Sequence, residues 1–293
     1  MTSNSEIHIY EDATAIVTGG ASGIGRALAE ELSKRGCEVV IADLQLELAE
    51  EIARAINASG GKATAVRVDV SCFSAMEQLV MDTVKRTGRI DYLFNNAGIG
   101  IGGEVKDYEI EDWDYIVDIN LRGVINGIQA VYKVMISQGF GHIVNTASIA
   151  GLMPSPGMVS YSAVKHAVVG LSKSLRAEAA HYGIRVSVFC PGFVRTAILE
   201  GGGKYGKVLI DWSPEQQKIM LKEIEKFKPI EPNTFAQKAL NSVAKNKAII
   251  VIPTWWKCLL WIHRLFPSVG ILIAQKSYED NEKKFSQQNT RQP

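Results

Sequence analysis

The chain has 293 residues, of which 32 are basic and 31 acidic, and its formal net charge is +1. This balance argues against a nucleic-acid-binding surface or an acidic tail, so we expect small molecules or other subunits, and no nucleic acid, as partners. The length exceeds that of most single domains, but one doubly wound α/β domain can accommodate it.

The first residues and the cysteines bear on the cellular compartment. Residues 1–12 are polar and contain no apolar signal core, so secretion is not expected, and we predict that residues 1–10 are flexible. The cysteines are far apart and have no histidine at metal-ligand spacing: Cys37, Cys72, Cys190 and Cys258. They are best explained as reduced thiols of a cytoplasmic protein without a metal site.

Short apolar segments alternate with longer helical patterns along the chain. They occupy residues 13–18, 38–43, 63–68, 90–95, 142–146, 185–190 and 248–252. Their side chains show little polar alternation, which is typical of parallel strands covered on both faces. With right-handed crossovers, they predict a single Rossmann-like α/β domain at residues 11–253, with a doubly wound seven-stranded parallel sheet.

A glycine-rich run at residues 18–25 falls where the first strand should end and the first helix, at residues 24–34, should begin. Glycines let a backbone approach a pyrophosphate, and a helix N-terminus offers free amides to it. The run alone is weak support for a dinucleotide site. Its candidate contacts are Gly19, Ser22, Gly23, Ile24 and Gly25.

Asp43 follows at the end of the second predicted strand. Its carboxylate can accept hydrogen bonds from both hydroxyls of an adenosine ribose and would repel a 2′-phosphate. No arginine follows it directly, so NAD is favoured over NADP, although Arg26 leaves a phosphate partner open. The alternative is that Asp43 is an ordinary turn or N-cap residue.

Tyr161 and Lys165 are spaced as neighbours on one helix face, and Ser148 precedes them. A tyrosine titrates near pH ~10, so it needs a nearby cation to act as a base at neutral pH. The alternative is a buried aromatic beside a solvated lysine. The helix around Lys165 is small and apolar, however, and a lysine in such a helix needs a partner. We therefore predict a proton-transfer site beside a dinucleotide.

The chain resembles the short-chain dehydrogenase/reductase family over roughly residues 10–250, because several motifs follow in that family's order and spacing. They are residues 18–25, Asp69-Val70, Asn95-Asn96-Ala97-Gly98, Asn120, Ser148, Tyr161, Lys165 and residues 191–196. The stretches 148–154, 165–166 and 190–200 also resemble NAD-dependent 15-hydroxyprostaglandin dehydrogenases, but only locally.

This resemblance implies further cofactor contacts. Asp69 would bind the adenine amino group and Val70 would offer a backbone amide, while Asn96, Ala97 and Gly98 would pack against adenosine. Val194 and Thr196 would engage the nicotinamide carboxamide. Each has a simpler explanation, since asparagines form turns and residues 191–192 could be an ordinary loop.

The resemblance also implies a mechanism. NAD would accept a hydride from the carbinol carbon while Tyr161 removes the hydroxyl proton. Lys165 would lower the pKa of Tyr161 and bind the nicotinamide ribose, and Ser148 would polarise the substrate oxygen. Asn120 would hold a water that links Lys165 to solvent, unless it is only a helix-kink residue. A homodimer or homotetramer is expected.

The candidate substrate pocket is apolar, with Arg195 as its one obvious cation. Apart from Ser148, its walls would be Met153, Met158, Phe193 and Leu199, with Ile149, Leu152, Ile198 and Trp212 nearby, unless several of these belong to the core. A lipophilic secondary alcohol or its ketone fits best. The alternatives are an NADPH-dependent ketoreductase of lipid or fatty-acid metabolism and a non-catalytic dinucleotide-sensing scaffold. The scaffold would usually have lost Tyr161 or Lys165.

Two segments depart from simple expectations. Residues 192–212 predict no regular element, and a loop this long is usually functional. Residues 254–278 predict an amphipathic helical extension that carries tryptophans and is too short to span a bilayer. It could be a peripheral membrane helix or could cover the pocket or a subunit interface, and the second is slightly favoured. Residues 279–293 are expected to be disordered.

Overall fold

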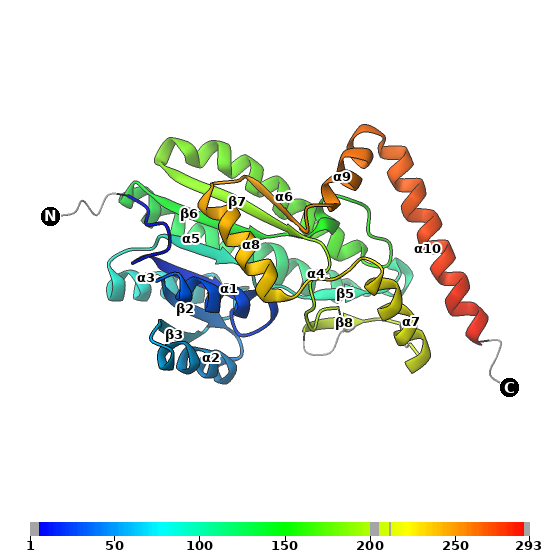
Figure 1. The fold of residues 1–293 in the computed structure, drawn as a ribbon, viewed down its shortest axis with the longest axis horizontal. Coiled ribbons are helices and arrows are strands. Elements are labelled where there is room, and N and C mark those ends of the chain that lie inside the picture. The colour runs from blue at the N-terminus through cyan, green and yellow to red at the C-terminus, as the bar shows by residue number, and fades with distance from the viewer. Residues whose placement is uncertain (1–5, 200–204, 211, 290–293) are drawn as a thin grey trace.

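The computed structural model describes residues 6–199, 205–210 and 212–289. Its main sheet has seven parallel strands: β1 (Thr14–Thr18), β2 (Glu38–Asp43), β3 (Lys62–Arg67), β4 (Tyr92–Asn95), β6 (Gly141–Thr146), β7 (Ile184–Pro191) and β9 (Ile249–Ile252). Their order is β3-β2-β1-β4-β6-β7-β9 (Figure 1). The predicted doubly wound seven-stranded sheet is therefore confirmed, and each strand lies within two residues of its expected limits.

Helices cover both faces of the sheet. α1 (Gly23–Lys34), α2 (Leu46–Ala58) and α8 (Pro232–Ala244) bury apolar side chains against one face. α3 (Phe73–Thr87), α5 (Gly123–Gln138) and α6 (Val159–Ala179) do so against the other. This double cover explains why the strand sequences show no polar alternation. The strand order reverses between β1 and β4, and at such a point the carboxyl ends of parallel strands form a crevice for ligands.

A second sheet corrects the expectation for residues 192–212. β5 (Gly100–Gly102) pairs in parallel with β8 (Gly206–Val208), so the predicted irregular loop contains a short strand. The sequence could not show this, because β8 forms by pairing with β5, which lies far away in the chain. Residues 200–204 and 211, which include the glycine triplet, lie outside the described residues.

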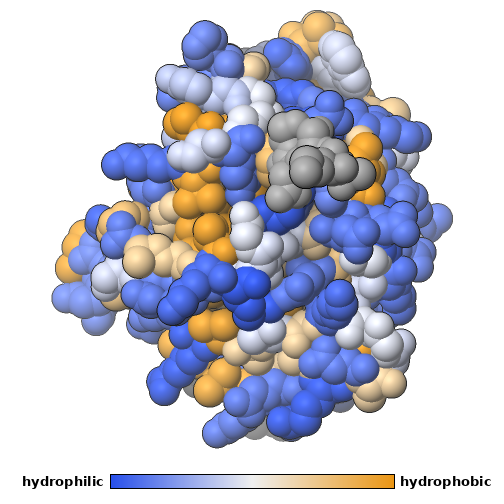
Figure 2. Space-filling view, turned by 90° about the vertical axis from the view of Figure 1, so that its left-hand side faces the viewer, coloured by the Kyte–Doolittle hydropathy of each residue, from blue (hydrophilic) through white to orange (hydrophobic). Residues whose placement is uncertain are grey.

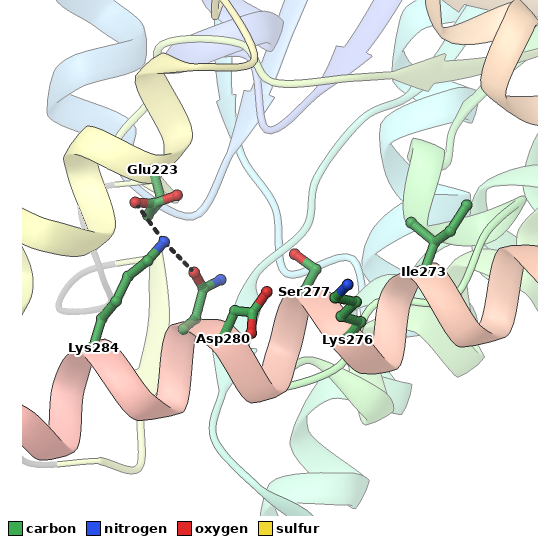
Figure 3. Close-up of a pocket in the computed structure, with 7 residues that line it drawn as sticks. Glu223, Ile273, Lys276, Ser277, Asp280 and Lys284 are labelled. Atoms are coloured by element: carbon green, nitrogen blue, oxygen red, sulfur yellow. Dashed lines mark hydrogen bonds and ion pairs between the residues drawn. The ribbon is translucent and has the colours of Figure 1, made fainter.

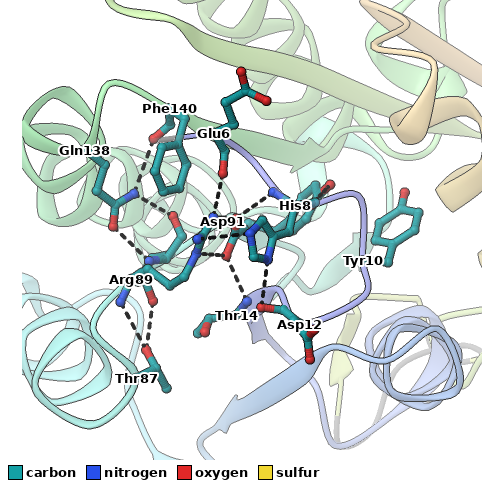
Figure 4. A network of polar contacts seen from close by, with 12 residues as sticks. Glu6, His8, Tyr10, Asp12, Thr14, Thr87, Arg89, Asp91, Gln138 and Phe140 are labelled. Atoms are coloured by element: carbon teal, nitrogen blue, oxygen red, sulfur yellow. Dashed lines mark hydrogen bonds and ion pairs between the residues drawn. The ribbon is translucent and has the colours of Figure 1, made fainter. Parts of the chain in front are cut away.

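The N-terminal segment is anchored under the sheet, which corrects the prediction of flexibility for residues 6–10 (Figure 4). The His8 backbone amide donates to Asp91 Oδ1 at 3.0 Å, and Arg89 donates to the Glu6 carbonyl at 2.7 Å. The Tyr10 hydroxyl donates to the Leu240 carbonyl. The sequence pattern missed this because all these partners lie far away in the chain. Residues 1–5 lie outside the described part.

The remaining helices are α4 (Ile110–Val117), α7 (Pro214–Glu225), α9 (Trp256–Leu265) and α10 (Pro267–Asn289). In Figure 1, α9 and α10 form a hairpin at one side of the domain. The predicted helical extension is thus present as two helices. α10 continues to Asn289, beyond the start of the disorder expected from residue 279, and Lys284 bridges to Glu223 on α7 at 3.0 Å. No helix within the described ranges is long and apolar enough to cross a membrane.

Candidate active site

Ser148 and Tyr161 meet beyond the carboxyl end of β6. Ser148 begins a short 3-10 turn at residues 149–151, where its hydroxyl oxygen accepts from the Ala150 amide at 3.2 Å. Tyr161 lies in the first turn of α6, and the Ser148 side chain is near enough to lower the pKa of its hydroxyl. These two members of the predicted proton-transfer site therefore lie close together.

Lys165 lies one turn further along α6 and is buried, with 3% of its surface exposed. Its Nζ donates to the Thr146 carbonyl at 2.9 Å and lies 5.4 Å from the centre of the Tyr161 ring. Burial lowers the pKa of Lys165 to about 8, against the opposing influence of the nearby Cys190 thiol. The partner that a buried lysine requires is thus the end of β6, and the ammonium form still predominates at neutral pH.

The pKa of Tyr161 moves opposite to the expected direction. Burial raises the pKa of this phenol, and the hydrogen bond from Ser148 only partly offsets that effect. The Lys165 ammonium, 5.4 Å from the centre of the tyrosine ring, does not reverse this direction. A further positive charge close to the hydroxyl would favour the phenolate.

Asn120 lies within a π-helical turn at residues 118–122 and is fully buried. Its side-chain oxygen accepts from the Ile99 amide at 2.8 Å and its nitrogen donates to the Ile99 carbonyl at 2.9 Å. A Cβ atom on Gly98 would lie 3.1 Å from Asn120 Oδ1 and 3.5 Å from Lys165 Nζ, so these three residues converge. The π-helical turn also agrees with the alternative that Asn120 is a helix-kink residue. Its predicted role of holding a water that links Lys165 to solvent stays a prediction.

The glycine-rich loop after β1 leaves no room for side chains. Gly19 has a φ of +62°, and a Cβ atom there would lie 2.7 Å from the Ala97 Cα, while one on Gly25 would clash with the Gly19 carbonyl oxygen. Asn96 fixes this loop by donating to the Thr18 carbonyl at 3.1 Å.

The first turn of α1 is open to an anion. Ser22 is the N-cap residue, but its side chain makes no capping hydrogen bond, and Gly23 and Ile24 begin the helix without an acidic residue in the first turn. Unsatisfied amides at such a helix end suit a pyrophosphate. The loop and the helix end therefore fit a dinucleotide, with the residues that the sequence proposed.

Asp43 is buried at the end of β2, and its carboxylate accepts hydrogen bonds from nearby backbone amides. Its Oδ2 accepts from the Ala21 amide at 2.9 Å, and its Oδ1 accepts from the Gln45 amide at 2.9 Å. Each oxygen keeps a further lone pair, so the turn role and a ribose contact are compatible. Arg26, the cation that left NADP open, is paired with Glu30 at 2.7 Å.

Asp69 and Val70 follow β3. Asp69 is exposed, and its Oδ1 accepts from the Ser71 amide at 2.9 Å and hydroxyl at 2.7 Å. Val70 is buried, and its carbonyl accepts from the Asn126 side chain at 2.8 Å. These bonds fix the shape of the turn and do not test the predicted adenine contacts.

The loop after β7 returns to the glycine-rich loop. Val194 is buried and forms a parallel bridge with Ile230. A Cβ atom on Gly23 would lie 3.1 Å from Thr196 Cγ2, so the predicted nicotinamide and phosphate segments are adjacent. Arg195 does not enter the site as a free cation, since it pairs with Glu225 at 2.8 Å and Glu231 at 3.0 Å.

The predicted pocket residues do not all lie together. Met158 lies with Ile198 beside Gly100, where a Cβ atom would be 3.7 Å and 3.2 Å from their side chains. Phe193 is 5.1 Å from the Phe227 ring and 6.1 Å from the Trp256 ring, centre to centre. Met153, Ile149 and Leu152 pack at the edge of the core. Leu199 and Trp212 are partly buried.

Trp256 and Phe227 were not predicted as site residues. Their rings stack at 5.7 Å between centres, and Trp256 is 6% exposed. The two consecutive tryptophans at residues 255–256 were the sequence feature that could have pointed to this contact. Only the fold shows that Trp256 packs on Phe193.

A separate groove of about 310 Å³ lies between α7 and α10 (Figure 3). Its lining is mainly polar and contains none of the predicted site residues: Glu223, Ile273, Lys276, Ser277, Asp280, Asn281 and Lys284. The chemistry just described does not take place there.

The sequence and the fold of this chain are similar to those of known proteins. The family model described as short chain dehydrogenase matches residues 13–204, most of the sheet and all three of Ser148, Tyr161 and Lys165. The chain belongs to this family. As a short-chain dehydrogenase, it is an oxidoreductase that acts on CH–OH groups.

Several relatives illustrate the similarity. Oxidoreductase UcpA of Salmonella typhimurium is 36% identical over 218 residues, which are 74% of this chain and 80% of that protein. Levodione reductase of Leifsonia aquatica is 37% identical over 198 residues, or 67% of this chain and 74% of the relative. A 3-oxoacyl-[acyl-carrier-protein] reductase of Synechocystis is 39% identical over 187 residues, covering 64% and 76%.

Solved structures agree. A short-chain dehydrogenase/reductase from Burkholderia phymatum in complex with NAD has a TM-score of 0.80 and 28% identity, and the match covers 90% of this chain and 96% of that one. Levodione reductase has a TM-score of 0.72 and 30% identity over 83% of this chain and 96% of that one. The narrower resemblance to 15-hydroxyprostaglandin dehydrogenases stays a prediction.

Proposed function

We propose that this short-chain dehydrogenase interconverts a lipophilic secondary alcohol and its ketone with NAD(H). The observation that carries the proposal is the grouping of Ser148 and Tyr161 with the buried Lys165, whose Nζ lies 5.4 Å from the centre of the tyrosine ring. This arrangement can hold an alcohol oxygen and move its proton. The glycine-rich loop and the open end of α1 support the dinucleotide.

In the proposed mechanism, Ser148 donates a hydrogen bond to the substrate oxygen and holds it against the Tyr161 hydroxyl. Tyr161 takes the alcohol proton during oxidation and returns it during ketone reduction. Bound NAD supplies the hydride acceptor and a positive nicotinamide ring. Lys165 supplies a positive charge next to Tyr161, because its pKa of about 8 leaves it protonated at neutral pH. The Thr146 carbonyl accepts a hydrogen bond from Lys165 Nζ, and the Asn120 side chain donates to the Ile99 carbonyl.

The proposed substrate class follows from the pocket walls. Phe193, Trp256 and Phe227 form one apolar side. Arg195 is neutralised by two glutamates, so no charge is available there for a substrate carboxylate. A lipophilic, uncharged alcohol suits such a wall.

The preference for NAD rests on Asp43 and Arg26. A buried carboxylate at the end of β2 would repel a 2′-phosphate, and Arg26 is engaged by Glu30. The competing function is an NADPH-dependent ketoreductase. It draws support from two relatives whose names denote reductases, levodione reductase and the 3-oxoacyl-[acyl-carrier-protein] reductase.

A homo-oligomer is also proposed. α4 and α5 expose apolar side chains, among them Ile110 and Ile125, which a neighbouring subunit could cover. The mass in solution, measured by light scattering, tests this. A monomer at micromolar concentration would contradict it.

The deciding experiment is a screen of secondary alcohols and ketones of increasing apolar length, each with NAD(H) and with NADP(H). We expect kcat/KM to rise with apolar length and to be higher with NAD. Faster turnover with NADP, or a preference for short acidic substrates, would overturn the proposal.

A further inference from the structure

The hairpin of α9 and α10 carries exposed apolar side chains that no other part of the described chain covers. Six of them are each more than half exposed: Trp261 63%, Leu265 63%, Phe266 61%, Ile271 54%, Leu272 62% and Ile273 60%. We call them the hairpin surface. Elsewhere, comparably exposed side chains such as Met81 and Ile110 lie apart from one another in the chain. A cluster of exposed apolar side chains on one helical hairpin marks an association site.

The face shown in Figure 2 offers a contrast, because it belongs to the side of the molecule opposite the hairpin in Figure 1. Hydrophilic side chains cover most of it, and hydrophobic ones form a narrow band and scattered spots between them. The hairpin surface is therefore unlike an ordinary side of this protein.

The charge around the hairpin surface is basic as far as residue 278, and acidic residues follow further along α10. Residues 253–278 contain no aspartate or glutamate but include Lys257, Arg264 and Lys276, whereas Glu279, Asp280 and Glu282 lie beyond the six apolar side chains. All three cations are exposed, and none takes part in an ion pair between the side chains that the structure describes. Apolar side chains beside unpaired basic ones complement an anionic lipid surface.

The hairpin is held rigidly at its base. Trp256 is buried against Phe193, and a Cβ atom on Gly192 would clash with the Trp256 ring nitrogen. The two helices touch where Gly270 meets the His263 ring, since a Cβ atom on Gly270 would clash with that ring. The exposed side chains are therefore presented on a fixed support.

From these observations we infer that the hairpin surface docks on an anionic lipid bilayer, with the helices lying at the interface and not crossing it. A second copy of the chain is the competing occupant. Ile271, Leu272 and Ile273 are consecutive, so they spread around much of the α10 circumference. Lipid chains are fluid and can surround such a helix at the interface, whereas a folded subunit would cover one side of it.

Docking in this way would place lipid next to the substrate pocket. The base of the hairpin packs on Phe193, and Tyr278 on α10 donates to Glu104 at 2.7 Å, close to the loop that precedes Tyr161. A lipophilic substrate could then pass from the bilayer to the site. This consequence rests on the proposed function, whereas docking itself does not.

Sedimentation of the full-length protein with lipid vesicles tests the inference without any turnover assay. Vesicles of phosphatidylcholine with phosphatidylglycerol should bind the protein, neutral phosphatidylcholine vesicles should bind it far less, and added salt should weaken the binding. The double variants Trp261→Ser with Phe266→Ser, and Lys257→Glu with Arg264→Glu, should each reduce the partition coefficient about tenfold or more.

Matched controls separate the hairpin surface from general effects. Met81→Ser with Ile9→Ser removes exposed apolar side chains elsewhere, and Lys133→Glu with Lys173→Glu reverses charges elsewhere. All variants should keep the parent Tm and its turnover of a water-soluble alcohol, and the controls should bind vesicles as the parent does.

Three results would overturn the inference. The first is that the parent protein sediments with neither type of vesicle, or equally with both. The control variants could lose as much binding as the hairpin variants. Finally, the hairpin variants could lower the oligomer mass in lipid-free solution, which would assign the surface to a subunit interface.

Discussion

The two sides of the active site are built in different ways. On the cofactor side, hydrogen bonds with backbone groups fix Asp43, Asn96 and the glycine-rich loop. On the substrate side, Phe193 is held by ring contacts with Phe227 and Trp256, and an exposed ion pair joins α7 to α10. Exposed pairs stabilise little, so the substrate side can vary or open while the cofactor side stays in place.

The largest expected effect concerns the group at the boundary between these sides. Tyr161→Phe removes the hydroxyl that moves the proton, so kcat should fall by about 10²–10⁴ while NADH affinity stays near that of the parent. Stopped-flow and fluorescence titration measure both quantities. Tyr182→Phe, at an exposed position, is the matched control. Turnover within tenfold of the parent would remove Tyr161 from the mechanism.

The cofactor side should respond to the charge of Asp43. Asp43→Asn keeps an acceptor of similar shape for the loop but removes the repulsion of a 2′-phosphate, so the preference for NAD over NADP should fall by about 1–3 kcal/mol. The ratio of kcat/KM values measures it. Glu47→Gln, an exposed acid in the first turn of α2, should leave the ratio unchanged. A parent enzyme that already prefers NADP would contradict this prediction.

The sheet beneath the site should lose stability in acid because of His142. Burial, with the charges of Arg185 and Arg176, lowers the pKa of His142 to about 3, and its Nε2 bonds to Ser187 at 2.8 Å. Since the folded pKa lies below the ordinary value, this contribution is complete above about pH 6.5 and declines as pH falls, by up to about 1.4 kcal/mol per pH unit.

Urea unfolding at several pH values measures the decline. His142→Gln should reduce the slope below pH 6.5, at some cost in stability at neutral pH, whereas His181→Gln at an exposed position should leave it unchanged. Equal slopes in the parent and His142→Gln would show that other groups govern acid sensitivity.

The smallest effect is expected on the substrate side. Lys284→Gln and Tyr278→Phe remove the links from α10 to Glu223 and Glu104. Because such partly exposed contacts are weak, KM for a lipophilic alcohol should rise only about two- or threefold, with kcat nearly constant. Lys283→Gln is the control on the same helix. A change in kcat larger than in KM would mean that α10 shapes the chemical step itself.

Local pattern allowed much of this protein to be predicted. Doubly covered strands need continuous apolar runs, so all seven strands were found, and Tyr161 and Lys165 share a helix face at their spacing. The motif residues Ser148, Asn120 and Asp43 were also located in advance. Their geometry supports the predicted roles, which remain to be tested.

Only the tertiary structure decided the rest, because these features depend on partners far away in the chain. β8 is ordered by β5, residues 6–10 are fixed by Asp91 and Arg89, and α10 continues past the expected start of disorder. The direction of the Tyr161 pKa follows burial, which spacing does not specify. The tail sequence showed an apolar pattern, but the fold alone separated buried Trp256 from exposed Trp261, since burial depends on what packs against each ring.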